Sequence, residues 1–187
     1  MSMPPDLQAA LLEKRVVFLR GRLDESAASS VISQLLLVSR LAPGRGCELY
    51  IDSSAGEVGA ALSVYDVLQT VGAPVSTTCL GRTSGPAVLV LAGGAPGRRY
   101  ALPHARIQLT EGEVALPGGG RFDVSQADEV ARQRQRWQSC LAQHAAYSDE
   151  RIARDVATGL WLSAAEARDY GIVDGIIPSI GASAMEA

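Results

Sequence analysis

A chain of 187 residues, 47% of them apolar and 20% charged, is long enough to bury a core and has the balance of a globular protein. Its formal net charge of −3 excludes the basic surface expected of a nucleic-acid-binding protein. No apolar run approaches the roughly 20 residues that span a bilayer, which excludes a membrane-spanning helix. We therefore expect no nucleic-acid partner and no membrane.

The cysteine and histidine content points to a reduced, metal-free protein. Cys47, Cys79 and Cys140 are odd in number and widely spaced, and the apolar context of the first two suits buried thiols. Only two histidines are present and no Cys-x-x-Cys occurs, so we expect no metal site. The first residues show neither the basic nor the apolar part of a signal peptide, and we expect a cytoplasmic protein.

Hydrophobic periodicity predicts helices and strands in alternation. We expect strands at 16–19, 47–51, 75–79, 99–101, 105–109 and 172–177, and helices at 7–13, 24–38, 58–71, 87–92, 125–146, 149–158 and 163–171. Gly21 closes the first strand, and a tight turn is expected at 53–56. This order is typical of an α/β fold with a mainly parallel sheet, and it predicts a single domain over residues 1–187.

The stretch from Cys79 to Ala92 is the first candidate for chemistry. An apolar strand leads into a turn that holds two glycines, Ser84 and Pro86, and an apolar helix follows. Many α/β enzymes carry a serine nucleophile at such a junction. The interpretation without chemistry is that Ser84 or Gly85 caps the helix and Pro86 occupies its first turn.

A serine nucleophile needs a base within hydrogen-bond reach. The chain offers only His104, which we expect in a surface turn, and His144, which we expect at the C-terminal end of the long helix, interacting with its dipole. Lys14 is the single lysine and lies near the start of the chain, which disfavours a Ser–Lys dyad. A structural role for Ser84 is therefore favoured, with Ser84 kept as a fallback nucleophile.

Five sequence blocks occur in an order and spacing that resemble one family. They are Leu11–Leu19, then Leu49–Ser53 with Gly56 and Ser63–Asp66, then Val75–Gly81, Arg99–Pro103, and finally Leu162–Ala167 with Tyr170–Asp174. Over roughly residues 9–178 the chain resembles the ClpP family, the proteolytic subunits of the ATP-dependent Clp protease, within the ClpP/crotonase superfamily. The resemblance implies an α/β, ClpP/crotonase-like fold of repeated β-β-α and βαβ units with a protruding handle at about 111–146.

The resemblance also implies where a catalytic triad would lie. The nucleophile would be four residues after Gly81, at Gly85, the base would be at Thr110, and the orienting acid at Gly159. None of these residues can perform its part, so the implied subunit resembles the inactive ClpR type. Loss of a whole triad lowers turnover by about 10⁶ in a well-studied serine protease.

The oxyanion hole implied by the family is changed as well. Its two backbone donors would be Gly56 and the residue after the nucleophile, here Pro86, which has no N–H. Loss of one such donor costs about 10²–10³ in turnover. We therefore predict a catalytically silent subunit.

The partners follow from the resemblance alone. It implies ClpP-like subunits in a heptameric ring, homo- or hetero-oligomeric and paired into a tetradecamer, a Clp ATPase that alone uses ATP, unfolded protein substrates, and no cofactor. Three alternatives stay open: an active serine endopeptidase that uses Ser84, a crotonase-like acyl-CoA enzyme, and a binding module unrelated to Clp proteolysis. The acyl-CoA alternative ranks low because Pro86 removes one of the two backbone donors it needs.

Overall fold

The computed structural model describes residues 4–114 and 124–178. Its helices are α1 (Pro5–Glu13), α2 (Glu25–Leu41), α3 (Val58–Thr70), α4 (Ala87–Ala92), α5 (Val124–Ala142), α6 (Asp149–Ala157) and α7 (Ala164–Asp169). Its strands are β1 (Val16–Leu23), β2 (Cys47–Gly56), β3 (Val75–Ser84), β4 (Arg99–Ala101), β5 (Arg106–Gln108), β6 (Trp161–Ser163) and β7 (Gly175–Ile176). The expected alternation of strands and helices is confirmed.

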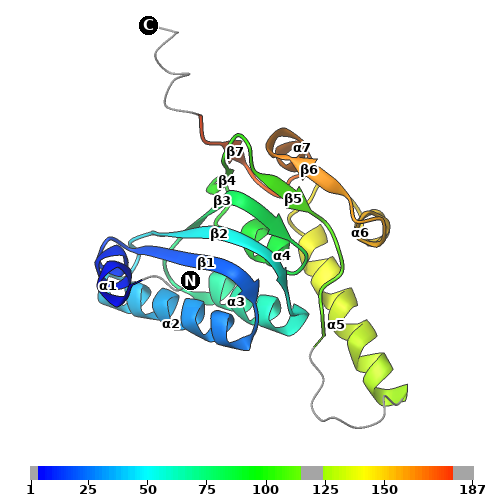
Figure 1. The fold of residues 1–187 in the computed structure, drawn as a ribbon, viewed down its shortest axis with the longest axis horizontal. Coiled ribbons are helices and arrows are strands. Elements are labelled where there is room, and N and C mark those ends of the chain that lie inside the picture. The colour runs from blue at the N-terminus through cyan, green and yellow to red at the C-terminus, as the bar shows by residue number, and fades with distance from the viewer. Residues whose placement is uncertain (1–3, 115–123, 179–187) are drawn as a thin grey trace, which may run out of the picture.

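One mainly parallel sheet organises the molecule. Strands β1, β2, β3, β4 and β7 are neighbours in that order and run parallel, while β5 pairs parallel with β3 and antiparallel with β6. Helices α2 and α3 lie along one face of the sheet, and α5 projects away from it (Figure 1). The α/β class is thus confirmed, and the antiparallel β5–β6 pair is an addition that the sequence pattern did not predict.

The core lies between the sheet and its helices. Alternate residues of β1, namely Val17, Leu19 and Leu23, are buried, as expected of a strand with one face covered. All six residues of α4 are buried, which explains why this short segment is apolar on every side. The strand and helix that flank the candidate turn are therefore among the most firmly packed parts of the chain.

Two glycine positions were assigned wrongly from the sequence. Gly21 does not end β1: it adopts φ +78° where the register with β2 shifts, so it accommodates a bulge inside the strand. The tight turn expected at 53–56 is instead the end of β2, which runs on to Gly56. Both strands are thus longer than predicted and reach the carboxyl edge of the sheet.

Several helix ends lie where the sequence predicted them. Helix α2 is capped by Asp24 as predicted, because the Asp24 carboxylate accepts a hydrogen bond from the Ala27 amide at 2.9 Å. The capping box of Ser163 and Glu166 is formed in both directions. The long helix α5 ends at Ala142, earlier than the predicted 146. Part of the expected handle, residues 115–123, lies outside the described residues.

Candidate functional site

The turn between β3 and α4 is an elbow formed by Gly85 and Pro86. Strand β3 continues through Ser84, and the chain then reverses at Gly85, which has φ +60°. The Gly85 amide donates to the Gln108 carbonyl oxygen at 3.1 Å, which ties the elbow to β5. A left-handed backbone favours glycine over any residue with a side chain. The elbow architecture expected at this junction is present, with glycine at its apex.

Ser84 lies one residue before the apex and faces the interior. Its exposed fraction is 1%, and its Oγ has no hydrogen-bond partner among the described residues. The prediction that Ser84 or Gly85 caps the helix is wrong: the N-cap of α4 is Pro86, whose φ of −57° and ψ of −31° are already helical, and no side chain caps it. Ser84 is therefore a buried strand residue, and its hydroxyl is shielded from any substrate in the solvent.

Two of the three positions that the resemblance pointed to adjoin at this elbow, and the third is linked to it through Gln108. A Cβ placed on Gly85 would lie 3.7 Å from the Thr110 Cγ2, so these two positions face one another. Gly159 follows α6 with φ +66°, and its carbonyl oxygen accepts a hydrogen bond from the Gln108 Nε2 at 3.4 Å. Gln108 thereby links the two: its backbone carbonyl binds Gly85 of the elbow, and its side-chain amide binds Gly159.

Gln108 is a residue that sequence reasoning missed. It lies at the end of β5, between Ser84 of β3 and Trp161 of β6 in the sheet register. A glutamine two residues before Thr110 gives no signal of its own in the sequence. Only the pairing of three strands from distant parts of the chain shows that it occupies the centre of the site.

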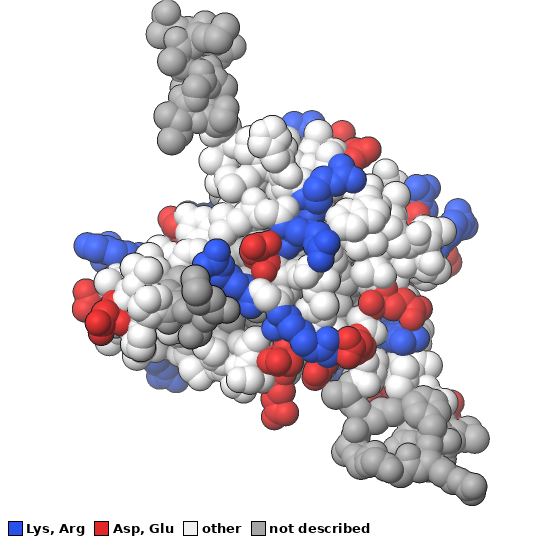
Figure 2. All heavy atoms as spheres, in the orientation of Figure 1, with Lys and Arg blue, Asp and Glu red and all other residues white. Residues whose placement is uncertain are grey.

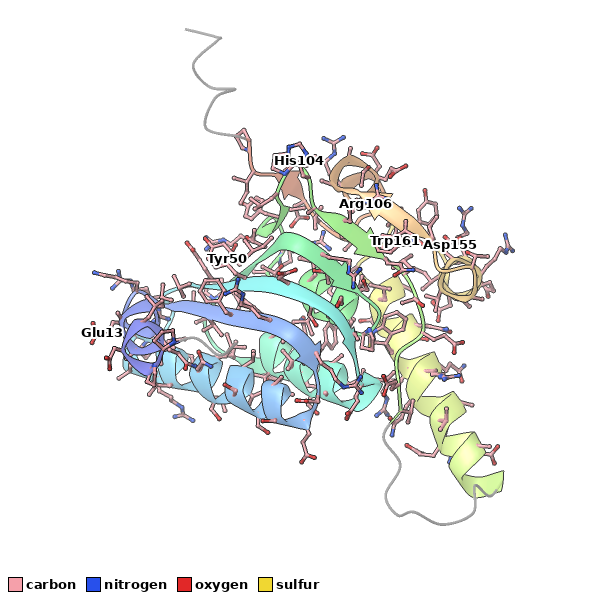
Figure 3. The ribbon with its side chains drawn as sticks, viewed as in Figure 1. Glu13, Tyr50, His104, Arg106, Asp155 and Trp161 are labelled. Atoms are coloured by element: carbon pink, nitrogen blue, oxygen red, sulfur yellow. The ribbon has the colours of Figure 1, made fainter. Side chains whose placement is uncertain are left out.

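Neither histidine lies at the elbow. His104 is exposed in the turn between β4 and β5, as predicted (Figure 3). His144 lies beyond the end of α5, where its Nε2 is 2.9 Å from the Tyr65 hydroxyl. Burial and the positive charge of Arg99 lower the pKa of His144, which favours its neutral form. His144 thus lies just after the last residue of α5 instead of within the helix, and its interaction with the helix dipole stays a prediction.

The segment that follows Thr110 crosses the elbow as a short extended piece of chain. The Glu113 amide donates to the Gly56 carbonyl oxygen at 3.0 Å, and the Val58 amide donates to the Glu113 carbonyl oxygen at 2.8 Å. A Cβ on Gly112 would overlap the ring of Pro86. We call residues 111–114 the covering segment, because they occupy the space between Gly56 and the elbow.

Ion pairs hold the covering segment at both ends. The Arg22 guanidinium binds both carboxylate oxygens of Glu113 at 2.6 Å and lies 3.6 Å from Glu57. The Arg134 Nη1 of α5 lies 2.9 Å from a carboxylate oxygen of Glu111. The hydrogen bonds from Arg22 lower the pKa of Glu113, so the pair with Arg22 persists at neutral pH.

The oxyanion candidates are close to this segment. Gly56 is buried against β1 so tightly that a Cβ would lie 2.6 Å from the Leu23 carbonyl oxygen, which requires glycine there. Pro86 carries no N–H, and its carbonyl oxygen accepts a hydrogen bond from the Trp137 Nε1 of α5 at 3.2 Å. The elbow itself thus offers no donor at the residue after its apex.

The cysteines, possible metal ligands and possible membrane-spanning helices can also be compared with the sequence analysis. Cys47 and Cys79 are buried free thiols as predicted, and burial raises the pKa of Cys79 to about 11. In residues 4–114 and 124–178, no three His, Cys, Asp or Glu side chains cluster so that they could hold a metal ion. Among the same residues, no helix is both long enough and apolar enough to cross a membrane.

A mainly parallel α/β sheet with a projecting helix is the architecture expected of the ClpP-like class. The model of the Clp protease family matches residues 3–179. A Streptomyces coelicolor protein, named as an ATP-dependent Clp protease proteolytic subunit-like protein, is 38% identical over 175 residues, covering 92% of this chain and 83% of its own length. The chain belongs to the Clp protease family.

Proposed function

We propose that the chain is a catalytically silent subunit of a Clp-type protease, which forms rings with active members of the same family. In this proposal Gly85, Thr110 and Gly159 occupy the nucleophile, base and acid positions. Glycine and threonine side chains supply neither the proton acceptor nor the orienting carboxylate that serine hydrolysis requires. The chain would contribute its scaffold to the assembly while neighbouring subunits cut the substrate.

The observation that carries the proposal is the geometry of the elbow. A Cβ on Gly85 would lie 3.7 Å from the Thr110 Cγ2, so the positions proposed for the nucleophile and its base adjoin one another, yet neither residue can react. Pro86 offers no N–H at the next position, so an oxyanion there would lack one of its two backbone donors. The strand–elbow–helix architecture is present, while the nucleophile, the base, the orienting acid and one oxyanion donor are missing.

The covering segment supports the same conclusion. Glu113 pairs with both Gly56 and Val58, so their facing backbone groups are already occupied by the chain itself. An extended peptide that used these groups would first have to displace Glu113 from Arg22. The fallback nucleophile is disfavoured on separate grounds, because the Ser84 hydroxyl is buried.

A peptidase assay tests the silent state. The purified chain is incubated with a fluorogenic peptide and with an unfolded protein, beside an active family member as reference. We expect no hydrolysis by the chain alone and no labelling by a serine-reactive phosphonate. Robust hydrolysis that disappears in Ser84→Ala would establish the displaced nucleophile instead.

The assembly is tested separately. We place the protein in the cytoplasm, in a heptameric ring that pairs into a tetradecamer and works with a Clp ATPase. Co-expression with the active subunits of its host, followed by native mass spectrometry, should give mixed rings. A chain that stays monomeric both with and without those subunits would instead favour a binding module that reuses the fold.

A further inference from the structure

Three loops meet at the amino edge of the sheet, opposite the elbow. Lys14 and Arg15 immediately precede β1, Arg45 precedes β2, and Arg98 precedes β4. Parallel strands begin at the same edge, so loops far apart in the sequence are brought side by side. The four side chains line one open cavity of about 630 Å³, together with Ser76 and Tyr100.

The cavity carries an excess of positive charge. Its lining holds four cations and one carboxylate, that of Glu48, whose Oε2 already accepts a hydrogen bond from the Tyr50 hydroxyl at 2.8 Å. None of the four cations lies within 4.0 Å of a carboxylate in the described parts of the chain. Six other arginines do form such pairs: Arg22, Arg99, Arg132, Arg134, Arg151 and Arg168. Other arginines outside the cavity, such as Arg20 and Arg154, are also exposed, so what distinguishes the cavity is that four cations share one lining with a single carboxylate.

Arg15 forms a rigid part of this cavity. Its Nε donates to the Gly46 carbonyl oxygen at 2.7 Å, its Nη1 to the Val38 carbonyl oxygen at 2.7 Å, and its Nη2 to the Arg45 carbonyl oxygen. Carbonyl oxygens satisfy the donors but leave the positive charge in place. Its φ of +65° is the only positive value for a residue other than glycine among the described residues, a strained backbone that the surrounding contacts maintain.

The other three cations are exposed and free to adapt. Lys14, Arg45 and Arg98 are solvent-exposed, each on a different loop. Arginine binds carboxylates through paired N–H groups, which suits recognition of several acidic side chains at once. The cavity therefore combines one cation held by backbone carbonyl oxygens, Arg15, with three exposed cations that can pair with acidic side chains.

We propose that this cavity, which we call the basic cavity, docks an acidic segment of a partner protein. The positive charge is confined to one small area of a chain whose net charge is −3, which favours a short acidic peptide over a nucleic acid. On the face shown in Figure 2, basic and acidic side chains are interspersed, so no continuous basic track leads along it. The basic cavity lies at the edge opposite Gly85, and the proposal holds whether or not the chain hydrolyses peptides.

A binding experiment with the full chain tests the proposal. A fluorescently labelled oligoglutamate peptide is titrated with the protein at low ionic strength and followed by anisotropy. The double variant Arg45→Gln, Arg98→Gln should weaken binding about tenfold, because each exposed pairing contributes only a few-fold in affinity. The matched control is Arg20→Gln, Arg154→Gln, which removes two exposed arginines elsewhere and should bind as the unmodified chain does.

Three outcomes would overturn the proposal. The first is that the unmodified chain does not bind the peptide at low salt. The second is equal weakening by the two double variants, which would show a general charge effect instead of a defined site. The third is displacement of the labelled peptide by an oligonucleotide or by inorganic phosphate at concentrations at which the unlabelled oligoglutamate peptide does not displace it. Circular dichroism confirms that each variant is folded.

Discussion

The indole nitrogen of Trp137 donates a hydrogen bond to the Pro86 carbonyl oxygen at 3.2 Å, and both residues are buried. This contact joins α5, which projects from the sheet, to the elbow at the end of β3. Because α5 also binds Glu111 through Arg134, the helix holds both the elbow and the covering segment. The position of α5 and the shape of the elbow are therefore coupled.

Removal of the indole N–H should destabilise the fold. We expect Trp137→Phe to lower the free energy of unfolding by about 1–3 kcal/mol, since a buried carbonyl loses its partner and some packing is lost. Urea unfolding followed by circular dichroism measures the change. Trp161→Phe is the control, because Trp161 is 39% exposed and packs beside Arg82 and Arg106 on the surface (Figure 3). An equal loss in both variants would contradict a special role for Trp137.

A side chain at the elbow apex should cost stability through its backbone. Gly85 has φ +60° and no atom within 3.7 Å of where a Cβ would lie, so space is not limiting. We expect Gly85→Ala to destabilise the fold by about 1–2 kcal/mol, the cost of a left-handed conformation. Gly72→Ala serves as control, since Gly72 has open space and no positive φ. Thermal unfolding that shows no difference between the two variants would contradict the argument.

Local signals explain what the sequence predicted well. The cap at Asp24 and the box at Ser163 each depend on residues three positions apart, and such contacts form wherever the helix forms. The alternation of apolar runs likewise sufficed for a mainly parallel α/β sheet. The position of the elbow between strand and helix was also predictable, although the length of the strand was not, because β3 runs on to Ser84.

Long-range contacts explain the errors. Gly21 looks like a strand end but accommodates a bulge whose position is set by pairing with β2. Gln108 became part of the site only through pairing of β5 with β3 and β6. The covering segment depends on Glu113 meeting Gly56 and Arg22, which are distant in the chain. No periodicity within a short window can show such contacts.

The ion pair of Arg22 and Glu113 should control how firmly the covering segment is held. In Glu113→Gln the paired charge is lost, while the backbone bonds to Gly56 and Val58 keep their geometry. We expect faster hydrogen exchange at the Val58 and Glu113 amides, measured by NMR, because the segment opens more often. High salt should shift the unmodified chain in the same direction.

The control for that change is Glu129→Gln on α5. Glu129 also pairs with an arginine, Arg132, and its other side-chain hydrogen bond comes from Gln133 of the same helix. Exchange at Val58 should be unaffected by it. If the two variants accelerate this amide equally, the ion pair at Glu113 does not hold the segment and the covering is maintained by backbone bonds alone.

Protonation of His144 should weaken the fold as the pH falls. Burial and the positive charge of Arg99 lower the pKa of His144 below its ordinary value of 6.5, so the unfolded chain binds this proton more readily than the folded one. The stability contribution is therefore complete above pH about 6.5 and is lost as the pH falls through the lower folded pKa. Urea unfolding at a series of pH values between about 7.5 and 5 measures this loss.

The control variants replace each histidine in turn. In His144→Gln this loss of stability at low pH should be absent, whereas His104→Gln, which alters only an exposed turn, should keep it. A pH dependence that survives in His144→Gln would assign it to other groups.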